Sequence, residues 1–241
     1  HNQGVPGSSP GGPTPIQRVL IFINQNPFSN SMKSNRIKNI IFDLGNVLLD
    51  IDYSLTAKRL SEVTGLDINR SLMDHGETFN KFETGKIPYV VFFNYLTKIS
   101  VKTALINDML PAWNAMLLEI QPSTWSFLRS ISTQYNCYIL SNTNETHIQW
   151  FDNYLQKHFS KEEWYNELFK KCFYSHEICL RKPDKYCFEY VLNNEGLIAS
   201  ETLFIDDTLE NIESAITLGI NAIHFDRKSQ DLESTLQNYL K

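Results

Sequence analysis

Three short apolar runs in this chain each end on polar side chains, and this repeated arrangement constrains the fold more than any other feature. The runs and their polar endings are Ile40–Phe42 with Asp43, Tyr138–Leu140 with Ser141 and Asn142, and Leu203–Ile205 with Asp206 and Asp207. Runs of this kind are typical of strands buried on both faces of a parallel sheet. Ligands bind outside the carboxyl ends of such strands, so we expect these polar residues to converge at one edge.

A basic segment, Arg181-Lys182-Pro183-Asp184, lies between the second and third of these runs. Proline favours the first turn of a helix, so a helix is predicted to begin just after Lys182. An acid, a hydroxyl, a lysine and a second acid pair would then meet at one sheet edge. This set of groups indicates phosphate chemistry around a divalent metal.

From residue 37 onwards, strand patterns alternate with helix patterns, which predicts an α/β fold with a doubly wound, Rossmann-like parallel sheet. Residues 53–120 contain no convincing long strand and instead predict helices over 54–64, 88–99 and 101–118. This stretch is too long for a simple crossover. We therefore expect a helical cap at 53–120, inserted into a core made of 37–52 and 121–241.

The first residues differ from the rest in composition. Residues 1–16 are rich in Gly, Pro and Ser, which predicts a segment that does not pack. We expect a flexible tail over 1–36. Met32 would be a natural start, so residues 1–31 are interpreted as a tail, an expression remnant or a start placed too early.

Composition excludes several classes of protein. A net charge of −5 and the absence of a basic run argue against nucleic-acid binding. The apolar run at 19–23 is far too short to span a bilayer, so no membrane association is expected. The four cysteines have no CxxC spacing, which favours reduced thiols and a cytoplasmic location over disulfides or zinc. Oligomeric state cannot be predicted from these data.

The order of the polar motifs resembles that of the haloacid dehalogenase superfamily. The chain carries Asp-Leu-Gly-Asn-Val at 43–47, Ser-Asn at 141–142, Arg-Lys-Pro-Asp at 181–184 and Asp-Asp-x-x-x-Asn at 206–211. More narrowly, it is similar to the capped, sugar-phosphatase-like members, whose cap also resembles residues 79–87. The resemblance covers roughly residues 37–226, and its strength lies in four motifs at the correct element boundaries.

The resemblance implies that Asp43 is a nucleophile that forms an aspartyl-phosphate. It also implies Mg²⁺, bound by Asp43, the carbonyl of Gly45 and a carboxylate of the acid pair. The motif points to Asp207 as the direct ligand, with Asp206 acting through water, and the sequence leaves the reverse open. The same acid pair is also a good N-cap for the helix that follows it.

The remaining motifs are assigned to the phosphate and its charge. Ser141 and Asn142 would hold phosphate oxygens, and Asn46 is placed in the same group. Lys182 would neutralise Asp43 and the phosphoryl oxygens. Each assignment has a structural alternative. Ser141 and Asn142 would form an ordinary strand-to-helix turn, and Lys182 would be a solvated surface lysine.

Two positions depart from the pattern of the superfamily. Most of its phosphatases carry a second Asp two residues after the nucleophile, as a proton donor, and this chain has Gly45 there. Loss of a general acid costs about 10²–10⁴ in rate. We therefore expect a preference for stable leaving groups, as in sugar 1-phosphates, acyl phosphates or aryl phosphates. Relatives also often have Gly where this chain has Cys179, so we expect the loop before Lys182 to differ from theirs.

The resulting hypothesis is a Mg²⁺-dependent phosphatase of small phosphorylated metabolites, with sugar phosphates expected. Two alternatives are a binding protein without turnover, motivated by Gly45, and a 2-haloacid dehalogenase, which would not need the acid pair. Within the cap, the candidates for substrate contact are His75, Phe79, Glu83 and Lys86. For each one separately, a solvated helix position or, for Phe79, a core position is favoured. Arg181 would either approach the substrate or pair with a surface acid.

Overall fold

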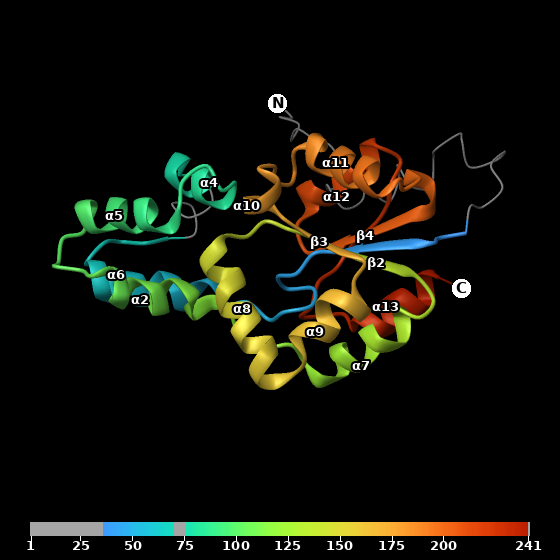
Figure 1. The fold of residues 1–241 in the computed structure, drawn as a ribbon, viewed down its shortest axis with the longest axis horizontal. Coiled ribbons are helices and arrows are strands. Elements are labelled where there is room, and N and C mark those ends of the chain that lie inside the picture. Colours follow the sequence, from blue (N-terminus) through green and yellow to red (C-terminus); the bar gives the residue numbers. More distant parts are fainter. Residues whose placement is uncertain (1–35, 70–75, 241) are drawn as a thin grey trace, which may run out of the picture. The chain divides into compact units, whose positions relative to one another are not determined.

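The computed structural model describes residues 36–69 and 76–240, and within them a five-stranded, fully parallel sheet forms the centre (Figure 1). The strand order is β3-β2-β1-β4-β5. The strands are β1 (Asn39–Phe42), β2 (Asn136–Ser141), β3 (Lys171–Tyr174), β4 (Thr202–Asp206) and β5 (Asn221–His224). The prediction of a doubly wound parallel sheet is confirmed.

The sheet is covered on both faces because successive side chains of a strand point to opposite sides. Ile40 and Phe42 enter one core cluster, and Ile41 enters the other. Figure 1 shows α11 and α12 on one side of the sheet and α7 and α13 on the other. The helices that flank the sheet are α7 (Pro122–Ile131), α8 (Glu145–His158), α11 (Lys185–Glu195), α12 (Leu209–Thr217) and α13 (Leu232–Tyr239).

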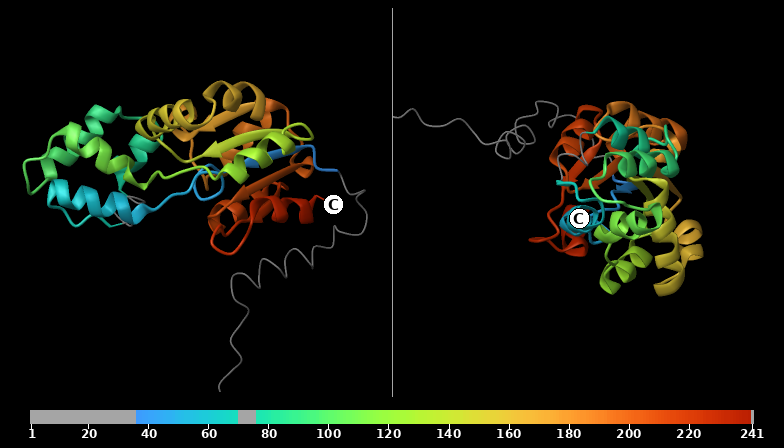
Figure 2. Two further views of the ribbon diagram at one scale, coloured as in Figure 1. Left: turned by 90° about the horizontal axis from the view of Figure 1, so that it is seen from below. Right: turned by 90° about the vertical axis from the view of Figure 1, so that its left-hand side faces the viewer.

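The chain between β1 and α7 is helical and lies beyond the end of the sheet, as Figure 1 and the left view of Figure 2 show. Its elements are α2 (Tyr53–Thr64), α4 (Glu77–Glu83), α5 (Tyr89–Ile99), α6 (Ile106–Trp113) and the 3₁₀ turn η2 (Asn114–Met116). Stacked and edge-on aromatic rings hold these helices together, among them Phe79, Phe82, Phe92, Phe93 and Trp113. This arrangement agrees with a cap at 53–120, whose boundaries stay a prediction.

The helix predicted over 101–118 was wrong in its length. The structure begins α6 only at Ile106, and the chain before it is held against the end of α2, where the amides of Val101 and Lys102 donate to the carbonyl of Thr64. At its other end, Leu117 forms an antiparallel bridge with Ile51, which returns the chain to the core. Tertiary hydrogen bonds therefore override the helical pattern at both ends.

Several short elements were not predicted. They are α4, α9 (Lys161–Glu163), the π-helical turn η3 (Trp164–Leu168), α10 (Ser175–Ile178) and the 3₁₀ turn η4 (Ala199–Glu201). Each is too short to give a clear periodic pattern. The predicted N-terminal tail lies outside the described residues, except for Arg36. No helix in the described ranges is long and apolar enough to cross a membrane.

Candidate active site

The carboxyl ends of the three central strands bring the predicted acids and hydroxyl together. Phe42 pairs with Ile139 on β2 and with Ile205 on β4, so the residues that follow these positions lie level. Asp43 donates its amide to the carbonyl of Ile205 over 2.9 Å. Asp43 and Asp206 therefore lie side by side, and Ser141, one residue beyond the level of Asp43 on β2, lines the same cavity.

Lys182 lies between two of these carboxylates. Its Nζ is 2.8 Å from Oδ1 of Asp43 and 2.6 Å from Oδ2 of Asp206, and its side chain is 1% exposed. Burial opposes the charged form of Lys182, but the carboxylates of Asp206 and Asp43 outweigh it and hold its pKa above the usual range. The alternative of a solvated surface lysine is therefore wrong.

The environment of Asp43 disfavours its ionised form. Burial raises the pKa of Asp43 to about 7 against the attraction of Lys182, and the carboxylates of Asp206 and Asp207 raise it further. A further positive charge beside Asp43 would lower this pKa and favour the ionised carboxylate.

The acid cluster has the composition of a site for a hard divalent cation. Asp43, Asp206 and Asp207 each offer a carboxylate oxygen, and these oxygens all lie within 4.8 Å of one another. Oxygen-only ligands suit Mg²⁺. These three carboxylates face one lysine, Lys182, so the residues present fit such an ion.

The two members of the acid pair have different surroundings. Asp206 is fully buried, and both of its oxygens already accept hydrogen bonds, from Lys182, from the amide of Thr208 and from the side chain of Asn211. Asp207 is half-buried and accepts from Asn46 over 2.9 Å and from the Thr208 hydroxyl over 3.2 Å. Asp207 therefore keeps more acceptor capacity for an ion, and its assignment as the direct ligand stays a prediction.

Asn46 has a contact that the sequence analysis did not foresee. Its backbone is left-handed, with φ of 55°, and its side-chain amide donates to Asp207 while its Oδ1 accepts from the amide of Ile51. Asn46 therefore positions a carboxylate of the acid cluster. Its predicted contact with phosphate stays a prediction.

Asn142 is similarly engaged. Its Nδ2 donates to the carbonyl of Lys182 over 2.8 Å, and its Oδ1 accepts from the amide of Lys182 over 2.9 Å. The side chain thus fixes the backbone that carries the lysine. Cys179, just before this loop, adopts the left-handed conformation, with φ of 58°, that glycine would take.

These groups line a cavity of about 550 Å³ between the sheet edge and the cap. The lining includes Asp43, Gly45, Ser141, Asn142, Lys182 and Asp207 from the core, with Tyr53, Glu83, Trp113, Met116 and Leu117 from the cap region. Trp113 and His147 also line the cavity and were not predicted from the sequence. The sequence contains little signal for such a role, because buried aromatic residues in helices most often belong to a core.

Arg181 also lines this cavity and pairs with the cap. Its guanidinium donates to Oδ1 of Asn80 over 2.6 Å and lies 3.0 Å from Oε2 of Glu83. Of the other predicted cap contacts, Phe79 is buried among aromatic rings and Lys86 is exposed. His75 lies outside the described residues.

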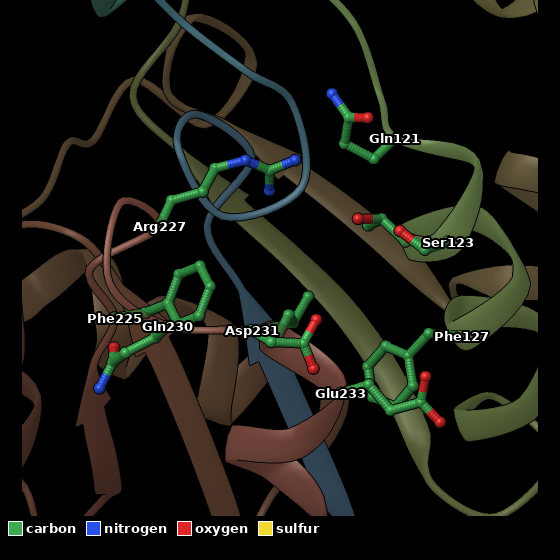
Figure 3. Close-up of a pocket in the computed structure, with 10 residues that line it drawn as sticks. Gln121, Ser123, Phe127, Phe225, Arg227, Gln230, Asp231 and Glu233 are labelled. Carbon is green, nitrogen blue, oxygen red and sulfur yellow. The ribbon is translucent and has the colours of Figure 1, made fainter.

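A second, smaller cavity of about 190 Å³ lies between the start of α7 and the segment after β5 (Figure 3). Figure 3 shows the side chain of Arg227 directed toward the loop that follows β1. There it donates to the carbonyl of Val47 over 2.7 Å and forms an ion pair with Asp50. This arginine holds the loop that leads from Asp43 into the cap.

Comparison with known proteins identifies the family. Residues 40–225 match the sequence profile of haloacid dehalogenase-like hydrolases, and the chain belongs to this family. The resemblance inferred from the motifs is confirmed.

Two characterised relatives have similar sequences. A D-ribitol-5-phosphate phosphatase of Bacteroides thetaiotaomicron is 28% identical over 76% of this chain and 89% of its own length. A sesquiterpene phosphatase of Aspergillus oryzae is 28% identical over 78% of this chain and 89% of its own. Among solved structures, a HAD family enzyme from B. thetaiotaomicron, in complex with magnesium and inorganic phosphate, has a TM-score of 0.75 and 27% identity. That similarity covers 83% of this chain and 98% of the enzyme.

Proposed function

We propose that this hydrolase is a Mg²⁺-dependent phosphatase that cleaves small phosphorylated metabolites through an aspartyl-phosphate on Asp43. The observation that carries the proposal is the position of Lys182, between Asp43 and Asp206 in the cavity at the sheet edge. The phosphatase relatives and the magnesium- and phosphate-bound structure of a similar enzyme support it.

In this mechanism a carboxylate oxygen of Asp43 attacks phosphorus, a new O–P bond forms and the bond to the leaving oxygen breaks. Water then attacks the phosphorus, releases orthophosphate and regenerates the carboxylate. Lys182 offsets negative charge on the phosphoryl oxygens, while the Ser141 hydroxyl, the backbone N–H of Asn142 and the second N–H of the Asn46 side-chain amide are proposed to orient them.

Mg²⁺ would be held by Asp43, the carbonyl of Gly45 and Asp207, and Asp206 would act through water. When bound, the ion supplies the positive charge that keeps the nucleophile ionised and stabilises the transferring phosphoryl group. The hydrogen bond from Asn46 to Asp207 orients that carboxylate in the way that outer-shell partners orient metal ligands.

Residue 45, two positions after Asp43, cannot donate a proton to the leaving group. Gly45 has no side chain, and Ile51 fills the neighbouring space. We therefore propose sugar phosphates whose leaving oxygen is stable, with 1-phosphates among the candidates. The ribitol relative acts, by its name, on an ordinary alkyl phosphate, so the rates on a sugar 1-phosphate and on the matching 6-phosphate test this point directly.

The experiment that tests the proposal is phosphate release from a panel of phosphorylated metabolites, with Mg²⁺ and with EDTA, for wild type and Asp43→Asn. Asp231→Asn is the matched control, because Asp231 caps α13 and asparagine caps a helix equally well. We expect magnesium-dependent release in wild type and control, and none from Asp43→Asn. Failure of the folded wild type on every substrate would favour a binding protein without turnover.

A further inference from the structure

The ion pair between Arg181 and Glu83 forms part of the wall of the active-site cavity. Both residues line the cavity, and their charged groups are 3.0 Å apart. Each side chain is only partly buried, with 30% and 26% of its surface exposed, so both remain accessible to a ligand. This pair therefore presents a donor and an acceptor side by side.

The backbone that carries each member of this pair is fixed by hydrogen bonds within the protein. Arg181 precedes Lys182, whose backbone is clamped by the side chain of Asn142. Glu83 ends α4, and its carbonyl accepts from the buried hydroxyl of Ser175 over 2.6 Å. Groups fixed in this way lose little entropy on binding, so they are suited to recognise a ligand.

The hydrogen-bonding capacity of the pair matches a hydroxyl group. A substrate hydroxyl can donate to the Glu83 carboxylate while it accepts from the Arg181 guanidinium.

The charges around the cavity disfavour a second anionic group on the substrate. The acids that line it are Asp43, Glu83, Asp207 and Glu210, against the two bases Arg181 and Lys182. A bound divalent cation would balance this set, and the phosphoryl dianion then makes the site negative. The charge of Arg181 is already paired with Glu83, so it offers little to a further carboxylate or phosphate.

The remaining wall is apolar and suits a carbon skeleton. It includes Ile51, Trp113, Met116, Leu117 and Ile148. The ring of Trp113 is stacked on that of His147, with centroids 5.1 Å apart, which fixes its orientation. The C–H faces of polyols and sugars can pack against such a wall while their hydroxyls bond to polar groups opposite.

We propose that Glu83 and Arg181 together select substrates with one phosphoryl group and a neutral, hydroxyl-bearing remainder, that is, polyol or sugar monophosphates. This inference rests on the proposed phosphatase function and narrows its substrate class. Glu83 supplies the acceptor and also neutralises Arg181, so it both favours hydroxyls and disfavours carboxylates.

Three five-carbon substrates with the same primary alkyl leaving group separate these effects. They are D-ribitol 5-phosphate, D-ribonate 5-phosphate, in which a carboxylate replaces the terminal hydroxymethyl group, and n-pentyl phosphate, which has no hydroxyl. With Mg²⁺ present, we expect wild type to favour ribitol 5-phosphate by at least about 10-fold in kcat/KM over each of the others.

The decisive variant is Glu83→Gln, with Arg181→Met as its partner. Glu83→Gln should lower the preference for ribitol 5-phosphate over pentyl phosphate by about 10-fold and raise relative activity on ribonate 5-phosphate, because Arg181 is no longer neutralised. Arg181→Met should lose the preference for ribitol 5-phosphate over pentyl phosphate without gaining activity on ribonate 5-phosphate. Glu163→Gln, which removes the acid of an ion pair with Arg129 outside the cavity, should leave all ratios unchanged.

Two results would overturn the inference and leave the phosphatase function standing. One is equal kcat/KM for the three substrates in wild type. The other is a parallel fall on all three in Glu83→Gln, which would mean that the pair only fastens the cap. If neither these substrates nor phenyl phosphate release phosphate with Mg²⁺, the proposed function fails, and the inference fails with it.

Discussion

The side chain of Ile51 occupies the space beside Gly45 into which any side chain at that position would have to extend. A Cβ built on Gly45 would lie 2.6 Å from Cδ1 of Ile51. The missing proton donor is therefore matched by a neighbour that fills its place, and restoring the acid requires the end of the Ile51 side chain to move or to be shortened.

Gly45→Asp alone is expected to displace the end of the Ile51 side chain, to lower stability by about 1 kcal/mol and to give a smaller gain in kcat on alkyl phosphates than the double variant. Gly45→Asp combined with Ile51→Ala should raise kcat on alkyl phosphates by about 10²-fold relative to Ile51→Ala alone, with little gain on phenyl phosphate. Steady-state kinetics on the two substrates measures this. An equal gain in the single and the double variant would show that Ile51 is no obstacle.

Lys182→Met is expected to abolish phosphate release and to destabilise the fold by about 3–5 kcal/mol at neutral pH, because it leaves the buried Asp206 without its cation. Lys182→Met combined with Asp206→Asn should regain part of the stability but none of the activity. Urea unfolding and phosphate release on the same preparations check both parts. Equal stability of the single and double variants would contradict the buried pair.

The pH dependence of stability should report on His147. Burial lowers the pKa of His147 to about 3, so the folded state keeps this ring neutral where the unfolded state takes up a proton. Its contribution to stability is complete above about pH 6.5, the unfolded-state pKa, and is lost as pH falls toward 3. The slope from this one group is about 1.4 kcal/mol per pH unit.

His147→Gln removes that slope. Urea unfolding between pH 7 and pH 4.5 should therefore show a smaller loss of stability in the variant than in wild type, whatever the difference at pH 7. Parallel curves would mean that His147 is protonated in the folded protein.

Gly85 marks the point where the cap lies against the core. Its φ is +64°, and a Cβ there would lie 2.0 Å from the carbonyl oxygen of His176. Gly85→Ala should therefore shift the backbone between α4 and α10, lower stability by about 1–3 kcal/mol and raise KM. Gly196→Ala is the matched control, since Gly196 has φ of +62° but nothing within 4 Å of its Cβ position. Thermal unfolding should show the larger loss for Gly85→Ala, and equal losses would contradict the close approach.

Sequence reasoning placed the sheet and the charged centre well, because both depend on local patterns. The run Ile40–Phe42 is apolar on both faces, so it predicts a central strand with little ambiguity. Asp43, Lys182 and Asp206 follow from strand ends and a proline-marked turn. The predicted length of α6 was wrong. The chain near Val101 is held by hydrogen bonds to Thr64 and does not belong to the helix. Such contacts join residues far apart in sequence and leave no periodic signal.

The sequence by itself determined which strands are central, where the acids and the lysine lie along the chain, and the family to which the chain belongs. Only the tertiary structure decided how the polar side chains share their hydrogen bonds. Asn46 and Asn142 have amides that can bind either phosphate or protein, and folding directs them to Asp207 and to the Lys182 backbone. The physical reason is that a hydrogen bond depends on position within a few tenths of an ångström, which is set when separate elements pack together.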